Sequence, residues 1–238
     1  MPRFLSGLYE RLGLNAYIQG DPKKALAWFR KLEAVEPDSI RVLRNLGVIL
    51  LSSGDAPGAE EYLLREERLY GESLHRHSAL ADLAFARGRR EDAAKRYAAA
   101  LADPDLAPAG GRSSQRGFLE KRLKICKDPA AFEAAARGAA VFAKAESERD
   151  AGDSKNALAL FEEAATLDPT HWPALNNAGT LALNVQGDAV RALALFERAF
   201  DLAQSAQVAR NVELARDWLA KEALARRSAT RKHERKSR

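Results

Sequence analysis

The stretch ALAWF, residues 25–29, decides the fold, because an alanine followed four residues later by a large apolar side chain recurs along the chain. Residues four apart lie on one face of an α-helix, so each alanine and its large apolar partner are expected on the same side of one helix. The alanines are separated by 34, 34, 64 and 35 residues. The five pairs are Ala25/Phe29, Ala59/Leu63, Ala93/Tyr97, Ala157/Phe161 and Ala192/Phe196. A repeat of about 34 residues therefore organises the chain.

Two further markers keep the same period. A small residue precedes each alanine, in the order Gly13, Gly47, Ala81, Ala145 and Gly179. Between the small residue and the alanine lies a turn signal, which reads Gly20-Asp21, Gly54-Asp55, Gly88-Arg89, Gly152-Asp153 and Gly187-Asp188. Glycine allows the positive φ that ends one helix, and an aspartate accepts hydrogen bonds from the free N–H groups that open the next. Each unit therefore reads as helix, tight turn, helix.

The combination of a large residue, Leu-Gly, Ala-x-x-x-Phe and then proline resembles the tetratricopeptide repeat. The first unit carries the whole pattern, at Tyr9, Leu12, Gly13, Ala25, Phe29 and Pro37. Later units depart from it: Gly71 stands where proline is usual, and Lys144 stands where leucine is expected. The fifth unit has one extra residue before its turn and no closing proline. The resemblance covers about residues 6–107 and 138–205.

The resemblance implies an all-α fold, an α-solenoid of about five helix-turn-helix repeats with an irregular insert and a C-terminal capping helix. We expect three repeats over 6–107, a loop plus helical insert over 108–137, two repeats over 138–205, a capping helix over 206–225 and a basic disordered tail over 226–238. The insert is either a degenerate repeat that keeps the stack continuous or a hinge between two blocks. We favour the continuous stack, because unpaired repeat faces would expose apolar surface.

Packing within the repeats follows from the residue types. The small residue of the first helix and the alanine of the second are expected where the two helices cross closely. The apolar residues of the capping helix recur at helical spacing and are expected to face the stack. They are Val208, Val212, Leu214, Ala215, Trp218, Leu219 and Leu224.

The positive charge of the chain belongs to its C-terminal end. Residues 226–238 contain seven Lys/Arg and one Glu, whereas the other 225 residues contain 31 basic and 32 acidic side chains. This segment has no aromatic residue for base stacking and no long apolar face for membrane insertion. We therefore favour a solubilising extension; the alternative is an accessory factor that associates with nucleic acid or anionic membrane through this tail. Neither nucleic acid nor membrane is expected as the main partner.

Other features bear on location and chemistry. There is no run of about 18 apolar residues and no secretory signal, so we expect a cytoplasmic protein. Cys126 is the single cysteine and is expected to be a partly buried apolar filler rather than a nucleophile. His75 and His77 are two apart and point to different sides of a helix. Neither a catalytic site nor a metal or cofactor site is expected, and we predict that the protein is not an enzyme.

The inner face of such a solenoid is formed by the first helices of the repeats. In the early repeats it would present Arg11, Leu14, Tyr17, Arg41, Arg44, Asn45, Val48, His75, Ser78 and Asp82. Some tetratricopeptide domains clamp a peptide carboxylate with a Lys/Asn pair, but the corresponding positions here hold Glu10 and Leu14.

Two groups of residues are candidates for a peptide-binding groove. Arg41, Arg44 and Asn45 could grip an acidic group of a peptide, or they form an ordinary solvated face. Asn176, Asn177 and Asn184 could bond the backbone of an extended peptide, or they belong to the ordinary surface. The resulting hypothesis is a non-enzymatic adaptor that holds a peptide or helix of another protein, with the partner and the oligomeric state left open.

Overall fold

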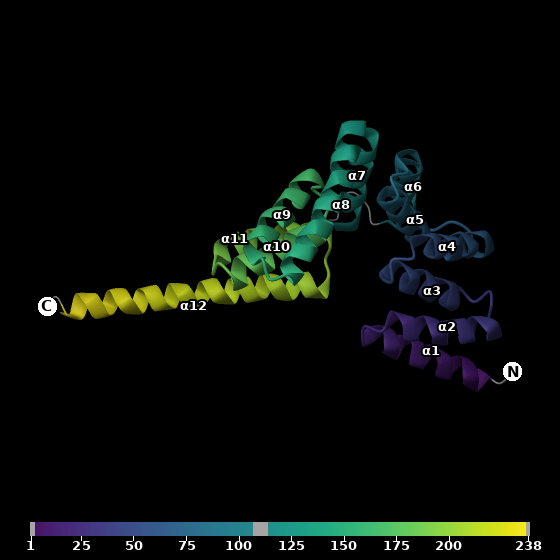
Figure 1. Ribbon diagram of the computed structural model, residues 1–238, viewed down its shortest axis with the longest axis horizontal. Coiled ribbons are helices and arrows are strands. Elements are labelled where there is room, and N and C mark those ends of the chain that lie inside the picture. The colour runs from purple at the N-terminus through teal and green to yellow at the C-terminus, as the bar shows by residue number, and fades with distance from the viewer. Residues whose placement is uncertain (1–2, 107–113, 237–238) are drawn as a thin grey trace. The chain divides into compact units, whose positions relative to one another are not determined.

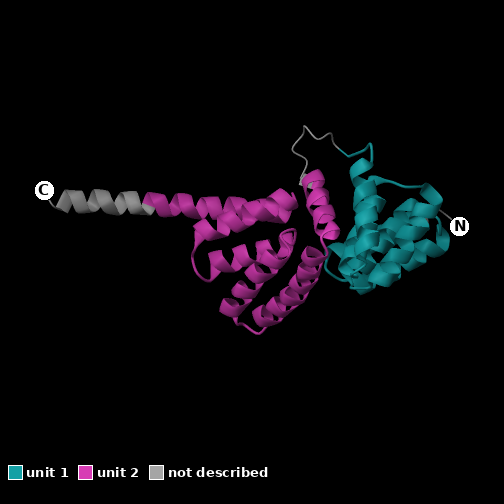
Figure 2. Ribbon diagram, turned by 90° about the horizontal axis from the view of Figure 1, so that it is seen from above, with its two compact units in different colours: residues 1–106 teal, residues 107–238 magenta. Residues whose placement is uncertain are grey.

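The computed structural model describes residues 3–106 and 114–236, with side chains described at 5–106 and 115–224. Over these residues the secondary structure is α-helix joined by short turns, as the sequence predicts. The helices group into two compact units, residues 1–106 and 107–238, which are coloured separately in Figure 2. Each unit has its own buried apolar cluster and is described by itself. No helix within the described residues is long and apolar enough to span a bilayer.

The first unit contains three consecutive helix pairs, one for each of the first three predicted repeats (Figure 1). Within each pair the two helices pack against each other, and each second helix also packs on the first helix of the next pair. This is the arrangement of a repeat stack. The helices are α1 (Arg3–Ile18), α2 (Pro22–Val35), α3 (Ile40–Ser52), α4 (Ala56–Tyr70), α5 (Leu74–Ala86) and α6 (Arg90–Ala102).

The second unit contains two further repeat pairs, α8/α9 and α10/α11, preceded by one helix and followed by another. Helix α12 packs on α10 and α11, so it closes the last repeat as a capping helix would. The helices are α7 (Ser114–Lys127), α8 (Pro129–Asp150), α9 (Ser154–Leu167), α10 (Trp172–Asn184), α11 (Ala189–Leu202) and α12 (Ala206–Lys236).

The turns inside the repeats have the predicted chemistry. The turn glycines adopt positive φ, for example 77° at Gly20 and 89° at Gly152, which side chains with a Cβ rarely adopt. The aspartate that follows caps the next helix in four repeats, as where Asp21 accepts a hydrogen bond from the Lys24 amide at 2.9 Å. The third repeat has Arg89 at this position, and its side chain makes no cap.

The repeat alanines are fully buried, and the first-helix glycine lies closest to the large residue four positions after the alanine. That residue is a phenylalanine in the first and fifth repeats and Leu63 in the second. A Cβ on Gly13 would lie 2.6 Å from two ring carbons of Phe29, and a Cβ on Gly179 would lie 2.7 Å from the ring of Phe196. The glycine therefore makes room for the ring, and the alanine lets the helix backbones approach.

Helix α7 belongs to the second unit. It packs on α8 and α11, and it lies within the insert predicted for 108–137. Its Arg122 Nη1 donates to Asp168 Oδ2 at 3.2 Å, where both side chains are largely buried. Cys126 is fully buried, as expected for an apolar filler. Most of the loop expected at 107–114 lies outside the described residues, and the continuous stack stays a prediction.

Helix α12 differs from the sequence expectation in two respects. The expected capping helix ends at residue 225, whereas α12 continues to Lys236, through a segment made mostly of Ala, Arg, Lys and Glu, which favour helix. Three of the apolar residues expected to face the stack are exposed instead: Leu214 by 50 %, Trp218 by 44 % and Leu224 by 65 %. The side of α12 that packs is narrower than its apolar pattern suggests.

Candidate functional site

An ion pair links the first helices of the first two repeats, because Arg41 Nη1 of α3 donates to Glu10 Oε2 of α1 at 2.8 Å. Side chains three, four or seven residues further along each helix share the face of this ion pair. On α1 these are Leu14 and Tyr17, and on α3 the corresponding residues 34 positions later are Val48 and Leu51. We call these four residues the apolar strip.

The apolar strip is exposed. Its four side chains are each between 36 and 40 % accessible, although all are large and apolar. Two exposed apolar side chains therefore lie on each of two consecutive first helices, at matching positions of the repeat. The sequence analysis placed Leu14, Tyr17 and Val48 on the inner face but gave weight to the charged residues beside them; Leu51 was missed.

Arg41 is already engaged by two carboxylates. One guanidinium nitrogen donates to Glu10 and the other to Glu36 Oε2 at 3.2 Å. Asn45 turns its amide nitrogen toward the Arg41 carbonyl of its own helix, at 2.8 Å. The charge of Arg41 is thus balanced within the protein, which favours the solvated-face interpretation for this pair of residues.

Arg44 is hydrogen-bonded to a buried carboxylate. Glu66 of α4 has no exposed surface, and its Oε1 accepts hydrogen bonds from Arg44 Nη2 at 3.0 Å and from Arg76 Nη1 of α5 at 2.7 Å. Arg76 is itself buried, whereas the Arg44 side chain is 44 % exposed. Two guanidinium groups therefore share one carboxylate, and the Arg44 end reaches solvent at the inner face.

The nearby titratable group is His75, on α5. Partial desolvation lowers the pKa of its imidazole, and the positive charges of Arg44 and Arg76 lower it further against the opposing effect of Glu66. A neutral imidazole at pH 7 adds no charge to this part of the inner face. Arg44 is thus the exposed charge that the Glu66 group presents here.

The asparagines of the second unit do not form one surface. Asn176 Oδ1 accepts a hydrogen bond from the Asn211 amide of α12 at 2.8 Å, so it fastens α12 to α10. Asn177 is half-buried beside it, and Asn184 is the exposed last residue of α10. The structure therefore gives Asn176 a packing role and leaves Asn177 and Asn184 as candidates.

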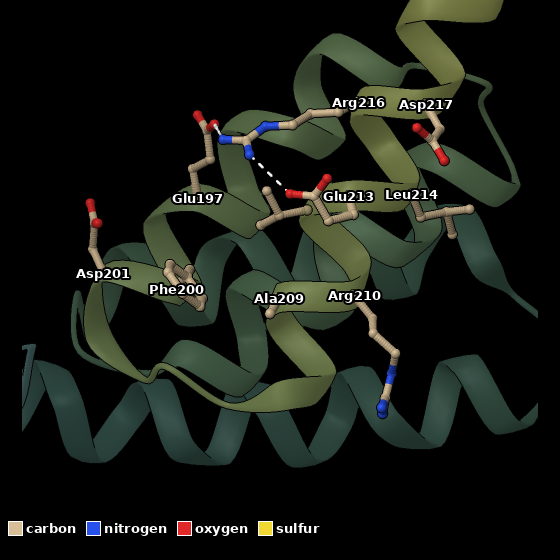
Figure 3. Close-up of a pocket in the computed structure, with 10 residues that line it drawn as sticks. Glu197, Phe200, Asp201, Ala209, Arg210, Glu213, Leu214, Arg216 and Asp217 are labelled. Carbon is tan, nitrogen blue, oxygen red and sulfur yellow. Dashed lines mark hydrogen bonds and ion pairs between the residues drawn. The ribbon is translucent and has the colours of Figure 1, made fainter.

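A second candidate site, which the sequence analysis missed, lies between α11 and α12 (Figure 3). It is an open pocket with a volume of about 760 Å³ and with carboxylates around an apolar floor. Arg216 bridges two of them, reaching Glu197 at 2.9 Å and Glu213 at 3.0 Å. The lining residues are Glu197, Phe200, Asp201, Ala209, Arg210, Val212, Glu213, Leu214, Arg216 and Asp217.

A sequence signal for this pocket existed. Ala209, Glu213 and Arg216 recur at spacings of four and three on the first helix of what would be a sixth repeat. In a complete repeat those positions face a second helix. Here α12 continues as one helix, and the three residues border the pocket instead.

The family comparison agrees with the repeat architecture. The profile of the family described as tetratricopeptide repeat matches residues 10–73 and 142–207. A crystal structure of MamA is 16% identical, with 84% of this chain and 92% of that chain covered and a TM-score of 0.44. A crystal structure of YrrB, a TPR protein described as having an unusual peptide-binding site, is 15% identical, covering 86% and 90%, with a TM-score of 0.41. PilW, a type IV pilus biogenesis factor, is 14% identical, covering 93% of both chains, with a TM-score of 0.44. No curated protein matches the sequence.

Proposed function

The chain belongs to the tetratricopeptide repeat family, and we propose that it acts without catalysis, as a protein-interaction module that holds a peptide or helix of another protein. The proposed binding surface is the inner face of α1, α3 and α5. The apolar strip carries this proposal, because four large apolar side chains are held at matching positions of two consecutive repeats with more than a third of each exposed.

The residues of the proposed binding surface indicate which kind of partner segment, here called the guest, it would bind. The strip suits a segment that presents apolar side chains along one side, such as an amphipathic helix or an alternating extended peptide. Arg44 lies one turn before Val48 on the same face, and its guanidinium is oriented by the buried Glu66. An acidic residue of the guest next to its apolar residues would meet this group in a charge-assisted hydrogen bond.

The proposal is tested by affinity capture from cells of the source organism, with the full chain and quantitative mass spectrometry of bound proteins. The variant Val48→Ser/Leu51→Ser removes half of the apolar strip without touching the core. The matched control is Val190→Ser, which changes an apolar side chain that is 68 % exposed on α11 of the other unit.

We expect a set of proteins that the wild type and the control capture equally and that the double variant loses by about tenfold or more. Arg44→Ala should weaken capture of the same proteins, whereas Asn184→Ala should not. If the double variant captures the same proteins in the same amounts as the wild type, the inner face of α1 and α3 is not the binding surface.

A further inference from the structure

Helix α12 begins as the first helix of a further repeat would begin. Ser205 Oγ accepts a hydrogen bond from the Val208 amide at 3.2 Å, just as His171 Nδ1 accepts one from the Ala174 amide at the start of α10. Helix α11 packs on α12 as α9 packs on α10. Within the described residues, α12 continues as one helix to residue 236 and no second helix follows it. One face of α12 therefore lacks the helix that would cover it in a complete repeat.

Counting from the cap identifies the uncovered face of α12. In complete repeats, the residues four, eight and eleven positions after the cap are buried, and a Cβ on Gly179 of α10 would lie 2.7 Å from Phe196 of the second helix α11. In α12 none of these three positions is buried, and all three line the pocket of Figure 3. The pocket therefore lies where a second helix would pack. The residues compared are Leu43, Gly47 and Leu50 of α3, His77, Ala81 and Ala84 of α5, Leu175, Gly179 and Ala182 of α10, and Ala209, Glu213 and Arg216 of α12.

The pocket combines an apolar floor with an acidic rim. Phe200 and Val212 are among its apolar residues, and its four carboxylates and two guanidinium groups give it a formal charge of −2. Arg216 is already shared by two of the carboxylates. The other two belong to Asp201 and Asp217, which make no ion pair among the described residues and lie on opposite sides of the pocket (Figure 3). A group that enters the pocket thus meets apolar side chains between two carboxylates that have no cationic partner.

These features define the segment that fits. A helix is the element that the repeat places at this position, and its apolar side would cover the floor. Glu213 stands where Gly179 stands in the preceding repeat, so a docked helix cannot approach α12 as closely as α11 approaches α10. Lysine and arginine can span the wider gap, because their apolar stems pack along the floor while their charged ends reach the rim. The pocket therefore suits an amphipathic helix whose apolar residues are flanked by Lys/Arg.

We propose that the pocket between α11 and α12 binds a basic amphipathic helix of another protein, which takes the place of the second helix of a sixth repeat. The apolar side of the docked helix covers Phe200 and Val212, and its Lys/Arg side chains pair with Asp201 and Asp217. This site is independent of the inner face of α1 and α3, and the two surfaces bind different segments.

Two helices of this chain supply matched probes. The peptides of residues 22–35 and 154–167 have 14 residues each, each is the second helix of a repeat, and each contains the alanine and phenylalanine four positions apart. The first has four Lys/Arg and one Glu, whereas the second has one Lys and two Glu. Fluorescence anisotropy of each labelled peptide, titrated with the full chain, measures the dissociation constant. The basic peptide should bind about tenfold or more tightly at low salt, and the difference should shrink as salt screens the rim.

Substitutions in the pocket locate the bound peptide. Asp201→Asn/Asp217→Asn removes two charges of the rim with little change in size and should weaken binding of the basic peptide by about tenfold or more. Ala209→Gln fills part of the floor with another residue that favours helix, and should weaken binding at low and high salt alike. The control Glu133→Gln/Glu163→Gln removes two exposed carboxylates from α8 and α9 of the same unit and should leave binding unchanged.

Three results would overturn the proposal. They are no binding of the basic peptide at low salt, equal affinity of the wild type for the two peptides, and unchanged affinity in both pocket variants while each remains folded by circular dichroism. Loss of binding in Val48→Ser/Leu51→Ser alone would place the peptide on the inner face of α1 and α3, and would remove the assignment to the pocket while leaving the proposed function intact.

Discussion

Whether the glycine of the first helix can be replaced by a larger residue depends on the side chain that it faces. In the first and fifth repeats that ring is phenylalanine, and an added Cβ would come within 2.6 to 2.8 Å of ring carbons. In the second repeat the corresponding residue is Leu63, whose nearest atom would lie 3.6 Å from a Cβ on Gly47. The glycine of the second repeat therefore has room for a Cβ, whereas the glycines of the first and fifth repeats do not.

A matched pair of substitutions checks this difference. Gly179→Ala should destabilise the fold by about 1 to 3 kcal/mol, because the Phe196 ring must move in a packed core. Gly47→Ala should be neutral or stabilising by up to about 1 kcal/mol, because alanine favours helix and the contact is ordinary. Urea unfolding of both variants measures the two free energies. Equal losses would contradict the role given to the ring.

Glu66 is a buried glutamate whose effect on stability depends on its two arginine partners. It occupies the place that Ala100, Ala164 and Ala199 fill in other repeats, and it links repeats two and three through Arg44 and Arg76. A carboxylate without exposed surface is tolerated here because two guanidinium groups share its charge. The substitution from a small residue to glutamate also gives Arg44 its fixed position at the inner face.

Replacing Glu66 and replacing Arg44 should lower the stability of the protein by different amounts. Glu66→Ala leaves the buried Arg76 without its partner and should destabilise the protein by about 3 kcal/mol or more. Arg44→Ala removes a half-exposed partner while Arg76 still balances Glu66, and should cost about 1 kcal/mol or less. Denaturant unfolding of the two variants gives the two losses in free energy of unfolding. Similar losses would contradict the conclusion that Arg76 is enough to balance the buried Glu66 carboxylate.

At the scale of single elements, helix starts depend on caps, and α10 has an unusual one. Its N-cap is His171, whose Nδ1 accepts a hydrogen bond from the Ala174 amide at 3.2 Å and whose ring lies 4.4 Å from the ring of Phe142. Burial lowers the pKa of His171; the Arg122 charge lowers it further, and Asp168 opposes this shift. The cap requires an unprotonated Nδ1, so it depends on the imidazole remaining neutral.

The stability of the second unit should therefore fall at acid pH. The unfolded imidazole takes up a proton near pH 6.5, whereas the folded one resists it until a lower pH. The contribution of His171 is complete above about pH 6.5 and is lost as pH falls toward the folded pKa. Melting midpoints at pH 7.5 and 5.5 should differ less in His171→Asn, which keeps a capping side chain and does not titrate. An unchanged difference would remove the histidine from the explanation.

For the whole molecule, the two apolar clusters are separate. The cluster of the first unit runs from Ala16 to Leu83, and that of the second runs from Ala145 to Ala215, so each is built from one unit's own residues. Units that bury their own cores are expected to fold alone. The proposed partner surface then belongs to the first folding unit.

Expression of residues 1–106 alone tests this independence. The fragment should give the circular dichroism spectrum of a helical protein and a cooperative thermal transition, because its core residues are all present. A spectrum typical of an unfolded chain would show that the first unit depends on the second for its stability.

Much of this architecture was predictable from the sequence, because the determinants of each repeat are local. Turn glycines, capping aspartates and the alanine with its large partner four residues later lie within one unit and act through neighbouring residues. Their recurrence at 34 residues predicted the helix pairs, and the apolar spacing over 206–225 predicted the capping helix.

Only the tertiary structure decided which of those residues are available to a partner. The sequence offered Arg41 and Arg44 as contacts for an acidic peptide group or as a solvated face. In the structure Arg41 pairs with Glu10, which lies 31 positions before it, and Arg44 pairs with Glu66, which lies 22 positions after it. Leu214, Trp218 and Leu224 of α12 were expected to face the stack, yet each is at least 44 % exposed. Exposure and charge balance are set by which distant segments pack together, and a helical pattern records only that a face is apolar, not what covers it.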